Sequence, residues 1–394
     1  MAGIDIAIVG GCGRVGLPLG LAFADRGLTV ALFDRNGDAV ASVNDGRMPF
    51  LEDGADEALA RVGDRLTATT DPSVVATAQT VIVVIGTPID EHLDPRPTAV
   101  PDAIAELRDH LRDGQLLVLR STLYPGVTAM VERLIASMGL AIDVSFCPER
   151  IVEGAALTEL YDLPQIVAAR TPAAQERAEK LFRTLTTVVV PLSPEEAELA
   201  KLFTNTWRYV KFAIANQLYM IANDFGLDFA RIRDAMTFDY PRAGDLPTPG
   251  FAAGPCLLKD TMQLAAFNTN TFVLGHASMM VNEGLPMYVV TRMEETFDLA
   301  NATVGVLGMS FKAGSDDTRD SLAYKLRRIL QFKAKRVICT DPYVATDDSL
   351  VPLADVLRDA DVLVIASPHA EYRDIATDKP VVDVWNLMGD GTRV

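Results

Sequence analysis

A cysteine followed closely by a lysine and an aspartate stands out in the stretch GFAAGPCLLKD, residues 250–260. A cysteine thiolate is a strong nucleophile near neutral pH, and a nearby cation such as Lys259 favours the thiolate over the thiol. Free cysteines are also among the residue types most often buried in a core. Taken alone, the stretch leaves two interpretations of Cys256 open, a catalytic nucleophile or a buried thiol.

Two further pairs of polar residues are spaced four apart, as neighbours on one helix face would be. Glu149 and Glu153 lie in CPERIVEG, and like charges so placed raise the proton affinity of one carboxylate, which suits a base. The alternative is a solvated acidic helix start. Lys201 and Asn205 join an ammonium and an amide that could stabilise a developing oxyanion, or they are a surface lysine beside a polar interface residue.

The segment IAIVGGCGRVGLPLG carries a dinucleotide fingerprint in Gly11, Gly13 and Gly16, between a predicted strand and a predicted helix. The next predicted strand, LTVALFD, ends in Asp34, whose carboxylate can accept hydrogen bonds from both ribose hydroxyls and would repel a 2′-phosphate. The pattern therefore predicts NAD rather than NADP. A structural turn with an incidental acid is the alternative, and Arg35 leaves NADP open.

Other loops follow strand-like segments, where open α/β sheets bind their ligands. GTPID and STLYPG offer the hydroxyl groups of Thr87, Ser121 and Thr122. The loop GMSFKAGSDDTRDS offers Lys312 and Arg319 for a phosphate or cofactor contact, against the alternative of a solvated charged loop.

The elements that must position these residues alternate along the chain. IDIAIVG, LTVALFD, TVIVVIG, QLLVLRS and IDVSFCP are candidate strands separated by helix-length stretches, which indicates a parallel sheet with helices on both faces. The same rhythm returns in ATVGVLGM, RVICTDP, DVLVIASP and PVVDVW. The predicted fold class is α/β, with two doubly wound Rossmann-like domains joined by a long central helix and a helical dimerisation region. The predicted domains are 1–192, 193–299 and 300–394.

The central helix is predicted over 194–225, with Ser193 and Glu196 as a capping box and Gly226 as the stop. It would be about 48 Å long at about 1.5 Å per residue, longer than an ordinary domain helix. Apolar residues on more than one of its faces, Trp207 and Ile214 among them, predict burial against a second subunit and hence a homodimer. A second helical tract is predicted over about 271–299.

Composition narrows the class of protein. The 394 residues are 49% hydrophobic and 23% charged, which indicates a globular chain of two or three domains. A formal net charge of −17 argues against nucleic acid as a partner. No apolar run approaches the roughly 18 residues of a membrane span, and the N-terminus lacks the basic region of a signal peptide. Four scattered cysteines and four dispersed histidines suggest neither disulfides nor a zinc site, so we expect a cytoplasmic protein without a metal.

Together the motifs resemble the UDP-glucose/GDP-mannose dehydrogenase family, the NAD-dependent nucleotide-sugar 6-dehydrogenases. The likeness spans nearly the whole chain, through GCGRVGLPL, STLYPG, CPERIVEG, AELAKLFTNTWR, GFAAGPCLLKD, LGMSFKAGSDDTRDS and TDPYV. It implies an NAD domain, a helical dimerisation centre and a domain for the nucleotide-sugar substrate. It also implies a four-electron oxidation at carbon 6 to the uronic acid, through a thiohemiacetal and a thioester on Cys256.

The resemblance also implies roles for individual residues. Glu149 would activate water, Lys201 and Asn205 would steady the oxyanion and shuttle protons, and Asp260 would hold a water beside Cys256. The residues implied to contact NAD are Gly11, Cys12, Gly13, Arg14, Val15, Gly16, Asp34, Arg35, Thr87, Ser121, Thr122, Glu153 and Arg319. Those implied to contact the substrate are Glu149, Lys201, Asn205, Gly250, Phe251, Phe311 and Lys312, with Arg242 reaching the partner subunit's site.

Three positions depart from the family pattern. Pro255 precedes the cysteine where a small residue is common, so the loop facing the sugar could differ in shape. Arg120 stands where other members often carry Glu or Lys, and we expect a surface variation there. Gln217 replaces an acid common on the long helix.

Two other functions remain open on the sequence. A two-electron β-hydroxyacid dehydrogenase would share the NAD domain and the long helix but needs no cysteine. A catalytically silent nucleotide-sugar-binding protein would not need Glu149, Lys201, Asn205, Cys256 and Asp260 together. The expected substrate is a UDP-hexose or a UDP-N-acetylhexosamine.

Overall fold

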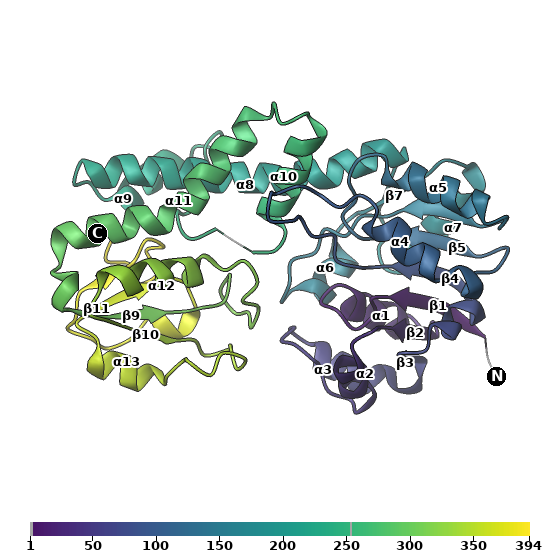
Figure 1. Ribbon diagram of the computed structural model, residues 1–394, viewed down its shortest axis with the longest axis horizontal. Helices are drawn as coiled ribbons and strands as arrows, with labels where there is room; N and C mark the ends of the chain where they lie inside the picture. Colours follow the sequence, from purple (N-terminus) through teal and green to yellow (C-terminus); the bar gives the residue numbers. More distant parts are fainter. Residues whose placement is uncertain (1–2, 253) are drawn as a thin grey trace. The chain divides into compact units, whose positions relative to one another are not determined.

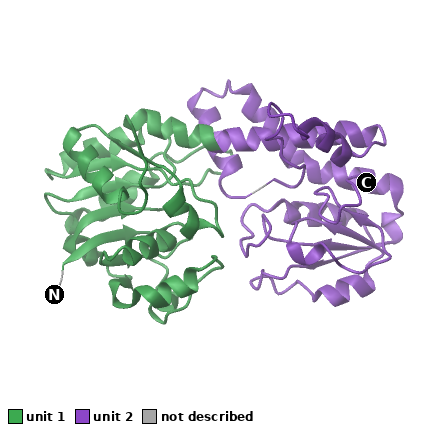
Figure 2. Cartoon of the chain, turned by 180° about the vertical axis from the view of Figure 1, so that it is seen from behind, with its two compact units in different colours: residues 1–204 green, residues 205–394 purple. Residues whose placement is uncertain are grey.

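The computed structural model describes residues 3–252 and 254–394, so Ala253 of the cysteine loop lies outside the described residues. The chain divides into two compact units, Met1–Thr204 and Asn205–Val394, coloured separately in Figure 2. The domain borders predicted at 192/193 and 299/300 stay a prediction. Within the described residues, no helix is both long and apolar enough to cross a membrane.

The first unit is built on an eight-stranded sheet with the order β3-β2-β1-β4-β5-β6-β7-β8 (Figure 1). Its strands are β1 (Ile4–Val9), β2 (Val30–Phe33), β3 (Leu66–Thr69), β4 (Ala78–Val83), β5 (Leu116–Leu119), β6 (Asp143–Phe146), β7 (Gln165–Ala169) and β8 (Val189–Leu192). The order 3-2-1-4-5-6 is that of dinucleotide-binding sheets. The predicted parallel sheet is confirmed except between β6 and β7, which pair antiparallel.

Helices cover both faces of this sheet, as predicted. They are α1 (Gly16–Asp25), α2 (Gly37–Asn44), α3 (Ala55–Val62), α4 (Ala99–Glu106), α5 (Val127–Ser137), α6 (Ala156–Asp162) and α7 (Pro172–Phe182). Residues of α1, α2, α3, α6 and α7 form one hydrophobic core with the sheet. Residues of α4 and α5 form a second core on the other face. The alternation along β1 explains the division, because Ile6 and Ile8 enter the first core and Ala7 and Val9 the second.

The long helix α8 (Pro194–Asp224) has the ends that its sequence predicts. The backbone N–H of Ser193 donates to Glu196 at 2.8 Å, and the N–H of Glu196 donates back to the Ser193 hydroxyl at 3.4 Å, which completes the capping box. Gly226 follows the helix with φ +69°, the left-handed conformation that glycine adopts at a helix C-terminus.

The second unit contains a four-stranded parallel sheet in the order β10-β9-β11-β12. Its strands are β9 (Thr303–Leu307), β10 (Arg336–Thr340), β11 (Val362–Ile365) and β12 (Val381–Val382). Its further helices are α9 (Phe229–Thr237), α10 (Leu257–Phe267), α11 (Val273–Thr296), α12 (Leu322–Lys333) and α13 (Leu353–Asp359). Residues of α11 and α12 pack in one core with the sheet and α13 in another, so the second doubly wound domain is confirmed.

A buried amide pair fixes the start of the cysteine loop in this unit. The Asn216 carboxamide on α8 accepts from the Gly250 N–H at 2.8 Å and donates to the Gly250 carbonyl at 3.1 Å. It also donates to the Asn282 side chain on α11 at 2.9 Å, and Asn282 donates to the Tyr209 carbonyl at 3.1 Å. Both asparagines are fully buried, so each lost partner would leave an unsatisfied polar group.

We expect Asn216→Ala to lower the free energy of unfolding by about 2–3 kcal/mol, because it strands the Gly250 backbone and the Asn282 amide. Gln217→Ala, at the exposed next position of the same helix, should change it by no more than about 0.5 kcal/mol. Thermal denaturation of both variants measures the difference. Equal shifts for the two would contradict a clamp at Asn216.

Candidate functional site

The turn between β1 and α1 is shaped by glycines that the fold itself requires. A Cβ on Gly11 would lie 2.7 Å from the Leu32 Cβ, and one on Gly16 would lie 2.4 Å from the Gly10 carbonyl oxygen. Gly13 differs, because a Cβ there would meet nothing nearer than 3.6 Å. The protein's own packing therefore does not demand glycine at position 13, whereas close approach of a pyrophosphate to the backbone does. This open position fits a bound dinucleotide.

Asp34 lies at the end of β2 beside this turn. Its Oδ2 accepts from the Cys12 N–H at 3.0 Å and its Oδ1 from the Asn36 N–H at 3.0 Å, which fixes the carboxylate at the strand end. Arg35 is turned to an ion pair with Glu106. Burial, followed by the charge of Asp34, raises the pKa of the Cys12 thiol to about 12, so Cys12 contributes its backbone and not a nucleophile.

Other residues of the first unit that are predicted for this cofactor lie around the same edge of the sheet. Val15 precedes α1, and the Arg14 guanidinium lies 5.0 Å from the centre of the Phe50 ring. The Ser121 hydroxyl accepts from the Ile85 N–H at 2.8 Å and so joins the ends of β4 and β5. Thr87 and Thr122 are half-buried in the two loops that follow these strands.

The CPERIVEG segment is not helical, so the prediction of two carboxylates on one helix face is wrong. Its backbone N–H groups are instead satisfied by acidic side chains. Glu149 Oε1 accepts from its neighbours Arg150, at 2.7 Å, and Ile151, at 3.1 Å. The Glu159 carboxylate accepts from the N–H of Val152 at 2.6 Å. The buried carboxylate of Glu52 accepts from residues 154 and 156 at 2.8 and 2.7 Å, which fixes the loop that carries Glu153.

The expectation that Arg120 is a surface variation is wrong, because Arg120 is only 1% exposed. Its Nε and Nη2 donate to Glu149 Oε2 at 2.9 and 2.5 Å. Its Nη1 donates to the Cys147 carbonyl at 2.9 Å and its Nη2 also to Gln165 Oε1 at 3.0 Å. The guanidinium lies 4.8 Å from the centre of the Phe182 ring. Glu149 therefore belongs to a buried ion pair.

Cys256 differs from the other three cysteines, since Cys12, Cys147 and Cys339 are buried and Cys256 is exposed. Burial is the main cause that raises the pKa of Cys147 and of Cys339 to about 11. Cys256 occupies the N-cap of α10, and its carbonyl accepts from the Asp260 N–H at 2.9 Å in the first turn. The positive end of the helix dipole favours an anion at this place, and thus a thiolate.

A polar cluster continues from Cys256 along α10. Asp260 is fully buried, and its Oδ2 accepts from the Asn205 amide on α8 at 2.5 Å. Its Oδ1 lies 2.7 Å from the Lys259 ammonium. Lys201, one turn before Asn205 on α8, is 9% exposed, so the alternative of a surface lysine is wrong. The second unit therefore brings three predicted site residues together, Asn205, Cys256 and Asp260.

The loop before Cys256 packs against two aromatic side chains of its own unit. A Cβ on Gly250 would lie 2.3 Å from the Trp385 ring, and one on Gly254 would lie 2.5 Å from the Phe311 ring. The cysteine loop thus lies against the predicted substrate-binding loop at Phe311. Phe251 is buried in the core of this unit.

The predicted cationic residues of the second unit are partly accessible. Arg319 is exposed and forms an ion pair with Asp317 at 2.6 Å, and Lys312 is half-buried in the same loop. Arg242 is exposed, with its Nε donating to the Tyr240 hydroxyl at 3.0 Å. An exposed guanidinium can bind an anion.

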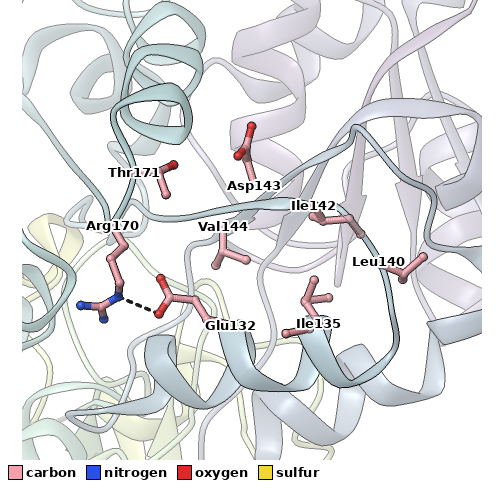
Figure 3. Close-up of a pocket in the computed structure, with 9 residues that line it drawn as sticks. Glu132, Ile135, Leu140, Ile142, Asp143, Val144, Arg170 and Thr171 are labelled. Atoms are coloured by element: carbon pink, nitrogen blue, oxygen red, sulfur yellow. Dashed lines mark hydrogen bonds and ion pairs between the residues drawn. The ribbon is translucent and has the colours of Figure 1, made fainter.

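A pocket of about 300 Å³ lies elsewhere on the first unit, between α5 and the start of β6 (Figure 3). Its floor is apolar, with Ile135, Ile142 and Val144. At its rim, Arg170 pairs with Glu132 at 2.9 Å and with Glu195 at 2.6 Å. The pocket contains no predicted site residue, and its cation is already neutralised.

Several residues that shape the site were missed by sequence reasoning. Glu52, Gln165, Asn216 and Asn282 are buried polar side chains that fix site loops or Arg120. Asp341 and His369 were also missed. The Asp341 carboxylate accepts from the N–H groups of residues 309 and 310, and the buried His369 ring lies 3.0 Å from that carboxylate. A polar residue inside an apolar stretch was the available signal, as for Asn216 within α8.

Three domains of one known protein family match almost the whole chain. Residues 4–186 match the NAD binding domain of the UDP-glucose/GDP-mannose dehydrogenase family, residues 195–283 its central domain and residues 305–390 its UDP binding domain.

Individual relatives agree. A UDP-N-acetyl-D-mannosamine dehydrogenase of Pyrococcus horikoshii is 31% identical, over 98% of this chain and 93% of that protein. A UDP-glucose 6-dehydrogenase of Haloferax volcanii is 31% identical, over 94% of this chain and 92% of that protein. The solved structure of a UDP-D-ManNAc dehydrogenase from Pyrococcus horikoshii is 27% identical, with a TM-score of 0.91 over 99% of this chain and 97% of that one. That of a UDP-glucose dehydrogenase from Pyrobaculum islandicum, also 27% identical, has a TM-score of 0.89 over 97% and 94%.

Two glycine variants separate folding from cofactor binding. Gly13→Ala should weaken NAD binding about tenfold or more, because the added methyl occupies the approach of the pyrophosphate. It should change the free energy of unfolding by no more than about 0.5 kcal/mol. Gly16→Ala should lower that free energy by about 1–3 kcal/mol through its clash with the Gly10 carbonyl. Calorimetric titration with NAD and thermal denaturation measure both effects, and unchanged NAD affinity in Gly13→Ala would contradict the assignment.

Proposed function

Because the chain belongs to the UDP-glucose/GDP-mannose dehydrogenase family, we propose that it oxidises its substrate by four electrons through covalent catalysis at Cys256. The chain is an NAD-dependent UDP-sugar dehydrogenase that forms a uronic acid. The observation that carries the covalent step is the position of Cys256, exposed at the N-terminus of α10 while the other three cysteines are buried.

The chemistry proceeds in two oxidations. NAD supplies the hydride acceptor for each of them. In the first, the carbon 6 hydroxyl loses a proton and its carbon loses a hydride, giving an aldehyde. The Cys256 thiolate adds to the aldehyde carbon and the oxygen takes a proton, giving a thiohemiacetal. Loss of that proton and of the second hydride leaves a thioester. Water then adds to the thioester carbon and the carbon–sulfur bond breaks. The uronic acid is released, and Cys256 is again a thiolate.

The polar cluster around α10 suits the oxyanions of this sequence. We assign Lys201 and Asn205 to the oxygen on carbon 6, because an ammonium and an amide can stabilise negative charge on it where water is excluded. Asp260, fixed by Asn205 and Lys259, is assigned to hold a water beside Cys256. Glu149 is the proposed base for the water that attacks the thioester.

The proposed NAD site consists of the glycine turn, with Asp34 for the ribose hydroxyls. The backbone of Cys12 through Val15 is part of this turn, and Arg35 follows Asp34 in the chain. Further contacts are assigned to Thr87, Ser121, Thr122, Glu153 and Arg319. A carboxylate at the end of β2 favours the free 2′-hydroxyl of NAD over the phosphate of NADP.

For the substrate we propose a UDP-hexose or a UDP-N-acetylhexosamine. Relatives of similar identity act on each kind, as their names state. The proposed contacts are Gly250, Phe251, the Phe311 ring and the Lys312 ammonium, with Arg242 reaching the partner's site. Pro255 lies between Cys256 and Gly254, and Gly254 packs against the Phe311 ring. The fixed φ of Pro255 therefore bears on which sugar fits.

Cys256→Ser should abolish release of two NADH per sugar, because a serine hydroxyl is far less ionised than a thiol near neutral pH. The variant should still bind NAD and UDP. The measurement is NADH absorbance per sugar consumed, over a panel of UDP-glucose, UDP-galactose, UDP-GlcNAc, UDP-ManNAc and GDP-mannose. Full turnover by Cys256→Ser would exclude the covalent role, and one NADH from a small hydroxyacid would favour the two-electron alternative.

We also propose a homodimer formed through the second unit. Trp207, Ile214 and Ile221 on α8 are spaced seven apart and are 56%, 46% and 49% exposed. Val273, Met280 and Met287 on α11 have the same spacing and are 76%, 73% and 51% exposed. Seven residues are two helical turns, so each helix presents an apolar stripe, as helices that pack on a partner do.

Ile214→Glu should dissociate this dimer, because a buried unpaired carboxylate at its centre is costly. The control, Lys180→Glu on α7, introduces the same side chain at an exposed polar position and should remain dimeric. Sedimentation at micromolar concentration measures both. A monomeric unmodified chain, or a dimeric Ile214→Glu variant, would contradict the proposed interface.

A further inference from the structure

We propose that Arg120 is a positioning residue that holds Glu149 in one orientation and supplies its countercharge for the hydrolytic half of the reaction. The inference rests on the proposed function, since it deepens the role assigned there to Glu149. Oε2 of this carboxylate receives two N–H groups of Arg120 and Oε1 receives two backbone N–H groups, at Arg150 and Ile151. These four bonds occupy the four lone-pair directions of an ionised carboxylate.

The two backbone donors cannot move without the loop, whereas the Arg120 donors can be exchanged. The guanidinium keeps its bonds to the Cys147 carbonyl and to Gln165, and its stacking on Phe182, if one N–H releases Oε2. Oε2 is therefore the oxygen that can accept a proton from the attacking water. The proton passes from that water to Oε2 as the water oxygen bonds to the thioester carbon, and Arg120 donates one hydrogen bond fewer to Glu149.

Arg120 is the countercharge that bonds directly to Glu149. Glu149 and Arg120 are both buried, with side chains 9% and 0% exposed. The Cys147 thiol is buried next to them, and burial raises its pKa to about 11, so it stays neutral. Arg150 is a further charge near Glu149, and its guanidinium donates to the Pro164 carbonyl. Burial without a bound cation favours the neutral form of a carboxyl group.

Arg120→Met therefore tests the inference. It should lower kcat near neutral pH by about 10- to 100-fold, the effect of an impaired general base, with KM nearly unchanged. The acid limb of the pH–kcat profile should move up by about one pH unit or more, because a carboxyl group without its cation holds a proton more tightly. The thioester on Cys256 should accumulate, seen as an acyl adduct by mass spectrometry of the quenched enzyme.

Arg120→Lys should restore most of kcat and shift the profile less, because it returns the charge without the two-pronged geometry. Should Arg120→Met fail to fold, this variant carries the test, with a smaller shift in the same direction. Arg177→Met is the matched control, because it breaks an arginine–carboxylate pair of 2.7 Å with Asp143 in the same unit. Its profile should be that of the unmodified enzyme.

Glu149→Gln separates this inference from the function on which it rests. Normal turnover by Glu149→Gln would remove Glu149 from the mechanism and with it the proposed base. If Glu149→Gln is inactive in hydrolysis but Arg120→Met and Arg120→Lys keep an unshifted profile and accumulate no adduct, the positioning role of Arg120 is overturned and the proposed function stands.

Discussion

The site loops of this protein depend on one constraint, that a buried backbone N–H must find an acceptor. Many N–H groups in the loops after β1, β6 and β9 have no acceptor within a helix or strand. Carboxylate side chains supply the acceptors instead. Asp34 does so for the glycine turn, Glu149 and Glu52 for the loop after β6, and Asp341 for the loop after β9. In the cysteine loop an amide, Asn216, has the same task.

This constraint also explains part of the acidic composition. The net charge of −17 argues against polyanionic partners, but not all of its acidic side chains lie on a solvated surface. Glu52, Glu149, Glu198 and Asp260 are buried acids, and Glu198 alone accepts three hydrogen bonds at the start of α5. Carboxylates that accept from backbone N–H groups replace their lost hydration by charge-assisted bonds. Glu149 and Asp260 are thus both structural acids of the fold and residues of the proposed site.

Much of the fold followed from local patterns. The strands with continuous β-branched runs were found, and the capping box at Ser193 and the stop at Gly226 placed the ends of α8 to within one residue. β3, β7 and β8, formed by LTAT, QIVAA and VVPL, were missed, and Pro191 within β8 argues against a strand on sequence grounds. The site was predicted where a motif stays local in sequence, as for Gly11 to Gly16. Arg120 could not be assigned, because its partners Glu149 and Gln165 are 29 and 45 residues away.

The central claim is that the sugar is carried on Cys256 while its carbon 6 is oxidised, and it can be observed directly. The unmodified enzyme is mixed with NAD and its UDP-sugar, quenched in acid within the first turnover, and digested for mass spectrometry. We predict that the peptide containing Cys256 carries the mass of the nucleotide-sugar acyl group, and that peptides with Cys12, Cys147 and Cys339 do not. NADH formation with an unmodified Cys256 peptide at every quench time would contradict covalent catalysis by this cysteine.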